Sequence, residues 1–346
     1  MREHMCSAWT VTLHFQALFS LAAAFRSIGR PREADRFEKS AAAVRKDFRR
    51  LLVVDGVLTG YALFDAGKVK QYLLHPKDEI TGVKYSSLAM VHAILEDLLT
   101  PAQAREHLKL IETKLSAPDG MRLFDRPMHY HGGPQRLFQR AETATYFGRE
   151  IGLMYTHAHL RYAQALAHMG EAERFFQALC QANPIGMRCI VPAATLRQSN
   201  CYYSSSDAAF ADRYEASEQY ERIVNGTIAL DGGWRVYSSG AGIALSLIIR
   251  RFLGVSPEAG VLRVDPVIPA SLDGMRVETT LLGRAAEVSY RIRAAGCGVA
   301  RIVLNDTDLP FHDERNPYRR GAALVSLSTV LERLKDGGNI LSIELG

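Results

Sequence analysis

The chain has 346 residues, a net charge of +5 at pH 7, and a composition that is 47% hydrophobic and 23% charged. These values are ordinary for a globular protein, and the length allows one large domain or two of average size. Lysine and arginine are dispersed, and the densest basic group, residues 45–50, fits the solvated face of one helix, so no nucleic-acid partner is expected.

The first two thirds of the sequence have a helical pattern, in which apolar residues recur at three- and four-residue spacing. Residues 9–28 form one apolar helix face that ends at Gly29 and Pro31. Pro101 stands where a helix can begin, and residues 57–64 predict a short hairpin. The other expected helices cover residues 32–52, 85–98, 152–169, 171–181 and 241–253.

After Gly254 the pattern changes to β-branched runs and alternating segments between turn residues, which is typical of strands. The expected strands cover residues 261–264, 276–282, 286–293, 299–305 and 340–345. The sequence therefore predicts a mainly α domain over residues 1–254, followed by a small β domain over residues 255–346.

The five cysteines are odd in number and scattered, and none has Cys-x-x-Cys or Cys/His ligand spacing. This distribution favours reduced thiols in the cytoplasm over a disulfide framework or a zinc site. The sequence has no signal-peptide pattern, and we expect no apolar run of the length that spans a membrane.

Residues 148–159, Gly-Arg-Glu-Ile-Gly-Leu-Met-Tyr-Thr-His-Ala-His, bring several polar side chains to the start of an otherwise apolar helix. A second segment, residues 234–242, puts Ser238, Ser239 and two glycines at the beginning of another helix. Buried helices rarely begin with so many polar groups unless these groups face a cleft. A cation, a carboxylate and a hydroxyl-lined helix start suit an anion and a polyol together, so the sequence predicts a site for phosphate and a sugar.

Each of these residues also has a structural interpretation. Arg149 and Glu150 would form a surface ion pair, and His157 and His159 would be hydrogen-bonded core histidines. Ser238 and Ser239 would cap the following helix, a role that does not exclude phosphate binding. Residues 129–133, His-Tyr-His-Gly-Gly, contain two histidines but no third ligand at helical spacing, so we expect a substrate loop there and no metal.

The two segments resemble landmarks of the inverting disaccharide phosphorylases of glycoside hydrolase family 94. Residues 149–158 are similar to the family's Arg-Glu-Asn-Gly-Gly-Gln-Tyr-Thr-His-Ala segment, and residues 234–242 to its Trp-Tyr-Thr-Gly-Ser-Ala-Gly segment. Further landmarks follow the family's order at residues 183–185 (Asn-Pro-Ile), 213–215 (Arg-Tyr-Glu) and 262–269 (Leu-Arg-Val-Asp-Pro-Val-Ile-Pro). Residues 200–208, Asn-Cys-Tyr-Tyr-Ser-Ser-Ser-Asp-Ala, most resemble the 1,2-β-oligoglucan phosphorylases and the phosphorylase-like C-terminal region of cyclic β-1,2-glucan synthases.

The resemblance implies an (α/α)6 barrel followed by a small C-terminal β-sandwich. It implies inverting phosphorolysis of a β-glucan oligosaccharide, with inorganic phosphate as co-substrate and without a cofactor or metal. Phosphate would be held by His157, the Ser238 hydroxyl and the Ser239 amide, although Ser239 stands where the family has glycine. The sugar would be bound by Arg149, Glu150, Tyr155, Glu215 and His131.

One departure from the family concerns the proton donor. The family's general acid is an aspartate in an Asp-Trp-Asn-Asp type of segment, and no Trp-Asn-Asp occurs here; residues 5–9 resemble the stretch shortly downstream of that segment in the family. The expected helices are also too few for a closed barrel. We therefore expect the C-terminal portion of a longer enzyme, with a partial barrel that leaves residues 9–28 uncovered and forms a homo-oligomer. Two alternatives are the C-terminal region of a cyclic β-1,2-glucan synthase and an inactive carbohydrate-binding remnant.

Overall fold

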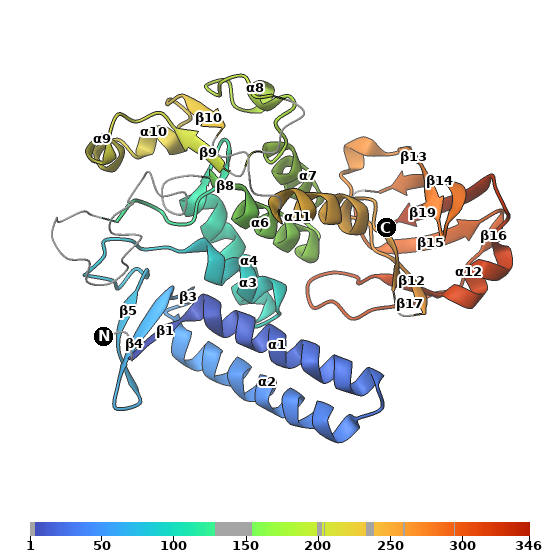
Figure 1. The fold of residues 1–346 in the computed structure, drawn as a ribbon, viewed down its shortest axis with the longest axis horizontal. Helices are drawn as coiled ribbons and strands as arrows, with labels where there is room; N and C mark the ends of the chain where they lie inside the picture. Colours follow the sequence, from blue (N-terminus) through green and yellow to red (C-terminus); the bar gives the residue numbers. More distant parts are fainter. Residues whose placement is uncertain are drawn as a thin grey trace. The chain divides into compact units, whose positions relative to one another are not determined.

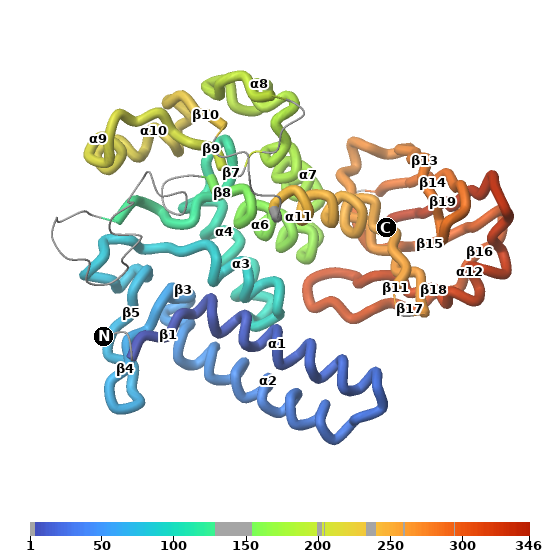
Figure 2. Tube along the Cα trace, in the orientation of Figure 1, coloured from blue at the N-terminus to red at the C-terminus, as the bar shows by residue number. Residues whose placement is uncertain are grey.

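A computed structural model describes residues 4–128, 154–198, 203, 205–232, 239–258, 260–293 and 295–346 (Figures 1 and 2). Contacts divide the chain into two compact units. Unit 1 comprises Met1–Tyr162 and Asn183–Tyr237, and unit 2 comprises Ala163–Ala182 and Ser238–Gly346. The contacts thus place residues 163–182 and 238–254 with the β-strands, whereas the expected domain boundary follows residue 254.

Unit 1 begins with an antiparallel pair of long helices, α1 (Ala8–Ser27) and α2 (Pro31–Leu52), as the sequence predicts (Figure 1). The hydroxyl of Ser7 accepts a hydrogen bond from the Thr10 amide at 3.3 Å and caps the first turn of α1. Gly29, at φ +74°, turns the chain between the helices. The rings of Phe25 and Phe37 stack at 5.5 Å across the pair.

The composition of α1 differs from that of a surface helix. Residues 8–25 contain no Asp, Glu, Lys or Arg, yet Trp9, Phe19 and Leu21 are all exposed. Within the described residues, α1 is long and apolar enough to cross a membrane by length and composition alone, and 22% of its apolar window is buried. The expectation that no apolar run reaches this length was therefore wrong, because Thr, His, Gln and Ser interrupt the run without adding a full charge.

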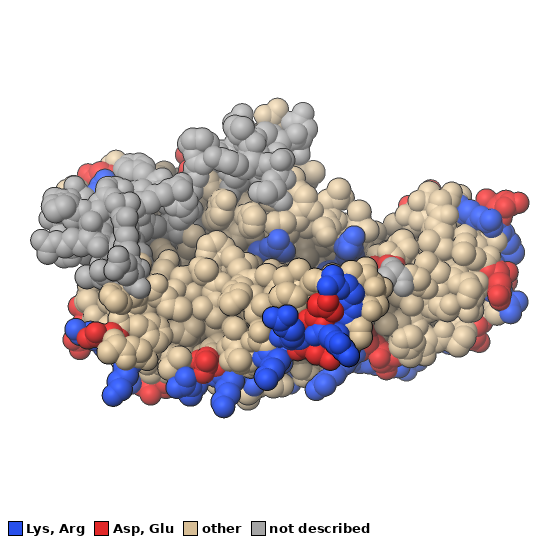
Figure 3. Space-filling model, turned by 60° about the horizontal axis from the view of Figure 1, so that its bottom comes forward, with Lys and Arg blue, Asp and Glu red and all other residues tan. Residues whose placement is uncertain are grey.

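Figure 3 shows the lower side of Figure 1, where α1 and α2 lie, turned toward the reader. A broad area of this face carries neither acidic nor basic side chains. Charged groups gather elsewhere on it, and at the far end of α1 Arg26 pairs with Asp35 and Glu38 of α2 at 3.0 and 2.7 Å. The charge of this helix pair is therefore concentrated on α2 and on the end of α1.

Two hairpins follow α2, and the predicted hairpin over residues 57–64 matches neither, because it spans the end of the first and the start of the second. Strands β2 (Val53–Val54) and β3 (Val57–Leu58) pair across Asp55-Gly56, and β4 (Tyr61–Asp65) and β5 (Lys68–Leu73) pair across Ala66-Gly67. All four turn residues have positive φ, which is the requirement of a tight two-residue hairpin turn. Strand β1 (Met5–Ser7) adds to β4 and completes a three-stranded sheet.

The remaining elements of unit 1 are shorter. Helices α3 (Ser87–Leu95) and α4 (Pro101–Leu110) follow the hairpins, and Thr100 and Gln103 form a reciprocal capping box at the start of α4. A π-helical turn, Ile111–Leu115, continues α4. The other elements are strands β6 (Ser116–Ala117), β7 (Gly120–Met121), β8 (Met154–Tyr155), β9 (Ser205–Ala208) and β10 (Leu230–Gly232), and helices α8 (Met187–Ile190), α9 (Arg213–Glu218) and α10 (Glu221–Val224).

Helix α6 (Thr156–Met169) begins in unit 1 and ends in unit 2. Unit 2 continues with α7 (Ala172–Gln181), α11 (Ser239–Leu247) and a π-helical turn, Ile248–Phe252. Two sheets then share one hydrophobic core, in strand orders β11-β12-β18-β17 and β13-β14-β19-β15-β16. Their members are β11 (Val255–Glu258), β12 (Val261–Val264), β13 (Arg276–Leu281), β14 (Arg284–Ile292), β15 (Val299–Leu304), β16 (Thr307–Asp308), β17 (His312–Asp313), β18 (Ala323–Ser326) and β19 (Asn339–Leu345), with α12 (Leu327–Arg333) between β18 and β19.

Strand β19 occupies the centre of the five-stranded sheet. It pairs in parallel with β14 and antiparallel with β15, and Leu341, Ile343 and Leu345 alternate into the core. The sequence predicted β12, β13, β14, β15 and β19, but not β11, β16, β17, β18 or α12. The observed sheets agree with the predicted β domain, while the described helices do not by themselves show a barrel.

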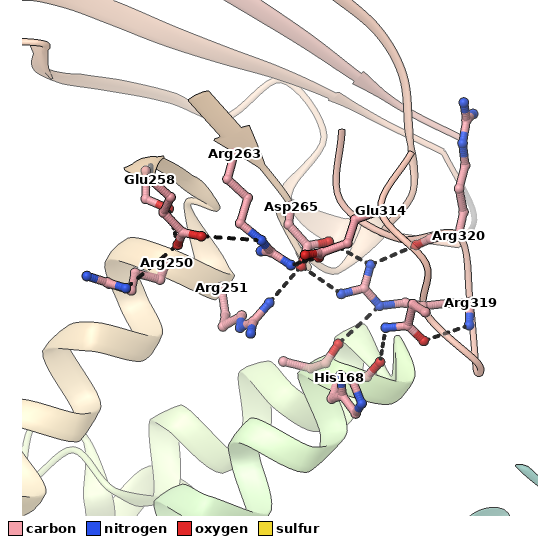
Figure 4. A network of polar contacts seen from close by, with 12 residues as sticks. His168, Arg250, Arg251, Glu258, Arg263, Asp265, Glu314, Arg319 and Arg320 are labelled. Carbon is pink, nitrogen blue, oxygen red and sulfur yellow. Dashed lines mark hydrogen bonds and ion pairs between the residues drawn. The ribbon is translucent and has the colours of Figure 1, made fainter. Parts of the chain in front are cut away.

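A polar network in unit 2 is centred on Asp265, directly after β12 (Figure 4). Its carboxylate is 3% exposed and accepts hydrogen bonds from Arg251, Arg263 and Arg319 at 2.7 to 3.1 Å. Arg319 also donates to the carbonyl of Ala167 at the end of α6. Burial opposes ionisation of Asp265, but the three arginines outweigh it and lower the pKa of the carboxyl.

Candidate functional site

The predicted site begins where β8 leads into α6. Met154 and Tyr155 pair with Ser206 and Ser205 of β9, which fixes the backbone just before the helix. Thr156, the first helical residue, is buried and donates its hydroxyl hydrogen to the carbonyl of Tyr203 at 2.9 Å. The first turn contains no acidic residue, so the positive end of the helix dipole is not neutralised by a carboxylate of this turn.

His157 lies in this first turn and is half-buried. Its ring stacks on that of Tyr155, with centroids 5.9 Å apart and planes 12° apart. Burial lowers the pKa of His157, and the positive charge of Arg161, one turn further along α6, lowers it further. The imidazole is therefore mainly neutral at pH 7. The structure thus brings together two residues of the predicted site, Tyr155 and His157.

Polar side chains of α1 and α3 belong to the same part of unit 1. The rings of Trp9 and His92 lie 6.2 Å apart, and the amide of Gln16 donates to the carboxylate of Glu96 at 2.8 Å. Burial lowers the pKa of His92 to about 4, and the charges of Arg161 and His157 contribute to this shift. The Nδ1 atom of His92 is buried and has no hydrogen-bond partner among the described residues.

Glu96 ends α3 and is shifted in the opposite direction. Burial raises the pKa of its carboxyl to about 7, and Asp97 adds to the shift, whereas Arg161 and the Gln16 hydrogen bond oppose it. Arg161 and Glu96 were not singled out from the sequence. The available signal was the i, i+4 spacing of His92 and Glu96 within a strongly apolar helix, which puts both on one face.

His159 has a structural role, unlike His157. It is fully buried, and its Nδ1 accepts a hydrogen bond from the Met121 amide at 3.1 Å. The ring also lies against Gly120, where a Cβ atom would come within 2.9 Å of Nδ1. His159 is therefore a hydrogen-bonded core histidine, which is the structural alternative considered from the sequence.

Glu215, the proposed sugar-binding carboxylate on α9, is held by local contacts. Its Oε2 accepts from the Ala211 amide at 2.6 Å, and its Oε1 lies 3.5 Å from Arg222. Asp212 caps the same helix by accepting from the amides of Tyr214 and Glu215 at 2.9 Å. These contacts orient the Glu215 side chain at the start of α9; its role in sugar binding remains a prediction.

Several predicted site residues lie outside the described residues: Arg149, Glu150, His131 and Ser238. Ser239 is described only as the first backbone position of α11. Across the described ranges, no group of three or more His, Cys, Asp or Glu residues could hold a metal ion.

A buried charged group, also missed from the sequence, lies beside β9 in unit 1. Arg122 is 2% exposed and pairs with fully buried Asp119 at 2.7 Å. Arg197 donates to the Ser206 hydroxyl at 2.9 Å and lies over the ring of Tyr203. Arg122 follows the short β6–β7 hairpin, and no local sequence pattern marks it as buried.

Comparison with known proteins supports the resemblance found in the motifs. The chain is 38% identical over 326 residues to the 1,2-β-oligoglucan phosphorylase of Listeria innocua, a match that covers 94% of this chain and 29% of that protein. No family model matches the chain.

Among solved structures, a sialidase superposes with a TM-score of 0.53 and 12% identity, over 93% of this chain and 26% of the sialidase. A glycosidase variant in complex with glucose superposes with a TM-score of 0.42 and 15% identity, over 70% of this chain and 52% of that chain. The first of these supports a fold that also occurs in a carbohydrate-active enzyme.

The chain is thus a relative of carbohydrate phosphorylases. More particularly, it is a close relative of the 1,2-β-oligoglucan phosphorylases over the part that it matches, which confirms the predicted resemblance. Since it spans 29% of the length of this relative, the activity of the whole enzyme comes to this chain only as a proposal.

Proposed function

We propose that this chain forms part of an inverting β-glucan phosphorylase, which converts β-1,2-linked glucose oligomers and phosphate into glucose 1-phosphate and an oligomer that is one glucose unit shorter. In such a reaction a phosphate oxygen attacks the anomeric carbon, the bond to the leaving sugar oxygen breaks, and a general acid protonates that oxygen. Because phosphate is already an anionic nucleophile, the enzyme needs to hold it and to supply the acid.

The observation that carries this proposal is the position of His157. A half-buried, neutral imidazole at the positive end of α6, with Arg161 one turn away, favours an anion over a cation. His157 would donate to a phosphate oxygen, and Ser238 with the Ser239 amide would complete the cradle. Arg149, Glu150, Tyr155, Glu215 and His131 would contact the sugar.

We expect no catalytic turnover by this chain alone, because its sequence contains no Trp-Asn-Asp segment that could carry the family's general acid. This observation favours, as a second candidate, a region that binds phosphate and glucan without catalysing the reaction by itself. General acid catalysis typically contributes about 10²–10⁴ in rate, so its loss would leave little product.

Calorimetric titration of the full chain with inorganic phosphate tests the binding step. We expect weak binding that His157→Ala reduces by about tenfold, the typical effect of losing one hydrogen bond to a charged group. His312→Ala, at an exposed histidine of β17, is the matched control and should leave the affinity unchanged. Equal phosphate affinity of the native chain and His157→Ala would contradict the phosphate site.

Incubating the chain with β-1,2-linked glucose oligomers and phosphate, and measuring glucose 1-phosphate, tests the catalytic step. We expect no product above the level of a protein-free blank. Robust product would show that another carboxylate, such as Glu150 or Glu215, serves as the acid.

A further inference from the structure

A polar hollow in unit 1 has a lining that shares no residue with the start of α6. It has a volume of about 440 Å³, within the range of roughly 300–1,000 Å³ that ligand pockets occupy. Three segments form its walls: the turn at Thr81–Gly82, the turn at residues 125–127, and helices α9 and α10. Sequence analysis singled out α9 for Glu215 but did not connect it with either turn.

Hydrogen bonds between these segments hold the walls together. Asp125 Oδ1 accepts from the amides of Lys84 and Tyr85 at 2.9 and 3.0 Å, which ties the two turns to each other. Tyr220, between α9 and α10, is buried and donates its phenolic hydrogen to the carbonyl of Phe124 at 3.3 Å. Since each wall is bonded to a neighbour, the hollow is formed before any ligand enters.

The lining combines hydrogen-bonding groups of both kinds with apolar surface. Carboxylates come from Asp125, Glu218 and Glu221, and a guanidinium comes from Arg126, whose only close charged partner in the described ranges is Asp125 at 3.6 Å. Thr81 and Ser217 line the same space, together with the apolar surfaces of Pro127, Tyr220 and Val224.

This chemistry discriminates among ligand classes. Three carboxylates against one arginine repel phosphate, so the hollow is not a second phosphate site. The carboxylates do not converge on a common point, because no metal-binding group of three such residues exists in the described part of the chain. A neutral polyol complements all of these groups. Its hydroxyls can donate to the carboxylates and accept from the guanidinium, and its C–H faces can contact the apolar wall.

We propose that this hollow is a subsite for a glucosyl unit of an oligosaccharide, in which Arg126, Glu218 and Glu221 hydrogen-bond the sugar hydroxyls. The assignment deepens the proposed function and rests on it for the identity of the sugar. It adds a second point of contact for the glucan, so longer oligomers bind more tightly than short ones.

Calorimetric titration of the full chain with β-1,2-linked glucose oligomers of two to six units tests the subsite. We expect affinity to rise with length in the native chain, and Glu218→Gln combined with Glu221→Gln to weaken the longest oligomer by about tenfold. Ser217→Tyr, a bulky change at an exposed position of α9, should have the same effect by filling the hollow. Asp65→Asn, at an exposed carboxylate of β4, is the control and should bind as the native chain does.

Four outcomes would overturn the subsite: no oligomer binding by the native chain, equal affinity at all lengths, unchanged affinity in the variants, or calcium binding that the double variant abolishes while oligomer binding persists. Phosphate titration separates this test from that of the proposed function. The double variant should bind phosphate as the native chain does, because its substitutions lie outside the start of α6. If His157→Ala weakens phosphate binding but the substitutions in the hollow leave the oligomer affinity unchanged, the subsite is wrong and the phosphate site is not affected.

Discussion

Gln16 of α1 and Glu96 at the end of α3 are joined by a hydrogen bond of 2.8 Å, 80 residues apart in the sequence. The bond links two helices through a carboxylate whose pKa burial raises to about 7. The folded chain thus binds the Glu96 proton more tightly than the unfolded chain, in which the group has its ordinary pKa near 4.5. Glu96 therefore stabilises the fold most below pH 4.5, and its contribution declines as the pH rises through about 7.

Glu96→Gln should remove this pH dependence. Because Glu96 is partly exposed, we expect the variant to be more stable than the native chain at pH 8 by a discounted amount of about 1–2 kcal/mol, and nearly equal to it at pH 4.5. Urea unfolding at pH steps from 4.5 to 8 measures the difference. Glu106→Gln, on the exposed side of α4, should leave the slope intact; a native chain whose stability does not fall across this range would refute the assignment.

Gly120 makes a second prediction possible, because its φ of +132° and its close neighbours both exclude a side chain. A Cβ atom there would lie 2.8 Å from Met154 Cγ and 2.9 Å from His159 Nδ1. Gly120→Ala should cost about 2–4 kcal/mol in the free energy of unfolding. Gly186→Ala has a positive φ but no neighbour within 4 Å, so it should cost about 1 kcal/mol. Equal losses of stability in the two variants would show that the neighbours of Gly120, including His159, move at little cost to admit a Cβ atom.

Asp265→Asn should destabilise unit 2 strongly. The amide keeps the shape of the carboxylate but leaves three arginines around an uncharged group, a change that typically costs about 3–5 kcal/mol. Thermal and urea unfolding measure the loss. Glu287→Gln, whose ion pair with Arg276 lies on the surface at 3.6 Å, should change stability by less than about 1 kcal/mol. Similar effects of the two substitutions would mean that the buried network contributes no more than a surface pair.

The exposed apolar residues of α1 predict self-association. Trp9, Phe19 and Leu21 are exposed on a helix whose residues 8–25 carry no charge, and such apolar surface favours burial against another chain. Light scattering should therefore show a dimer or larger species, which Phe19→Glu combined with Leu21→Glu converts to monomer. Leu331→Glu, at an exposed leucine of α12, is the control. A monodisperse native monomer at tens of micromolar would contradict the prediction.

The sequence predicts elements well where the pattern is periodic. Residues 9–28 and 32–52 correspond within one or two positions to Ala8–Ser27 and Pro31–Leu52, because an apolar stripe and flanking Gly and Pro define both ends. The hairpin predicted over residues 57–64 was misplaced, because the Asp55-Gly56 turn signal was not used and Ala66-Gly67 lacks an Asn or Asp, although Ala66 adopts the positive φ that such residues favour. Strands β11 and β18 have four residues each and little alternation, which leaves no signal to separate them from loops.

The sequence predicts which site residues are neighbours along the chain, but it does not predict which residues from distant segments contact them. Period 3.6 puts His157 and His159 on different faces of α6, but it does not say which face meets the core. That choice depends on the β6–β7 hairpin, whose Met121 amide binds His159. In the same way, His92 meets the charge of His157, and both His92 and Glu96 meet that of Arg161, because α1, α3 and the start of α6 belong to one unit, a tertiary relationship that local pattern does not contain.

The central place of β19 has a consequence for biosynthesis. Strands β14 and β15 are synthesised well before residues 339–345, yet each pairs with β19 rather than with the other. While the ribosome adds the intervening residues, both strands have an unpaired edge, and such edges invite pairing with other nascent chains. The five-stranded sheet therefore closes in a late step, when β19 is inserted between two strands that already exist.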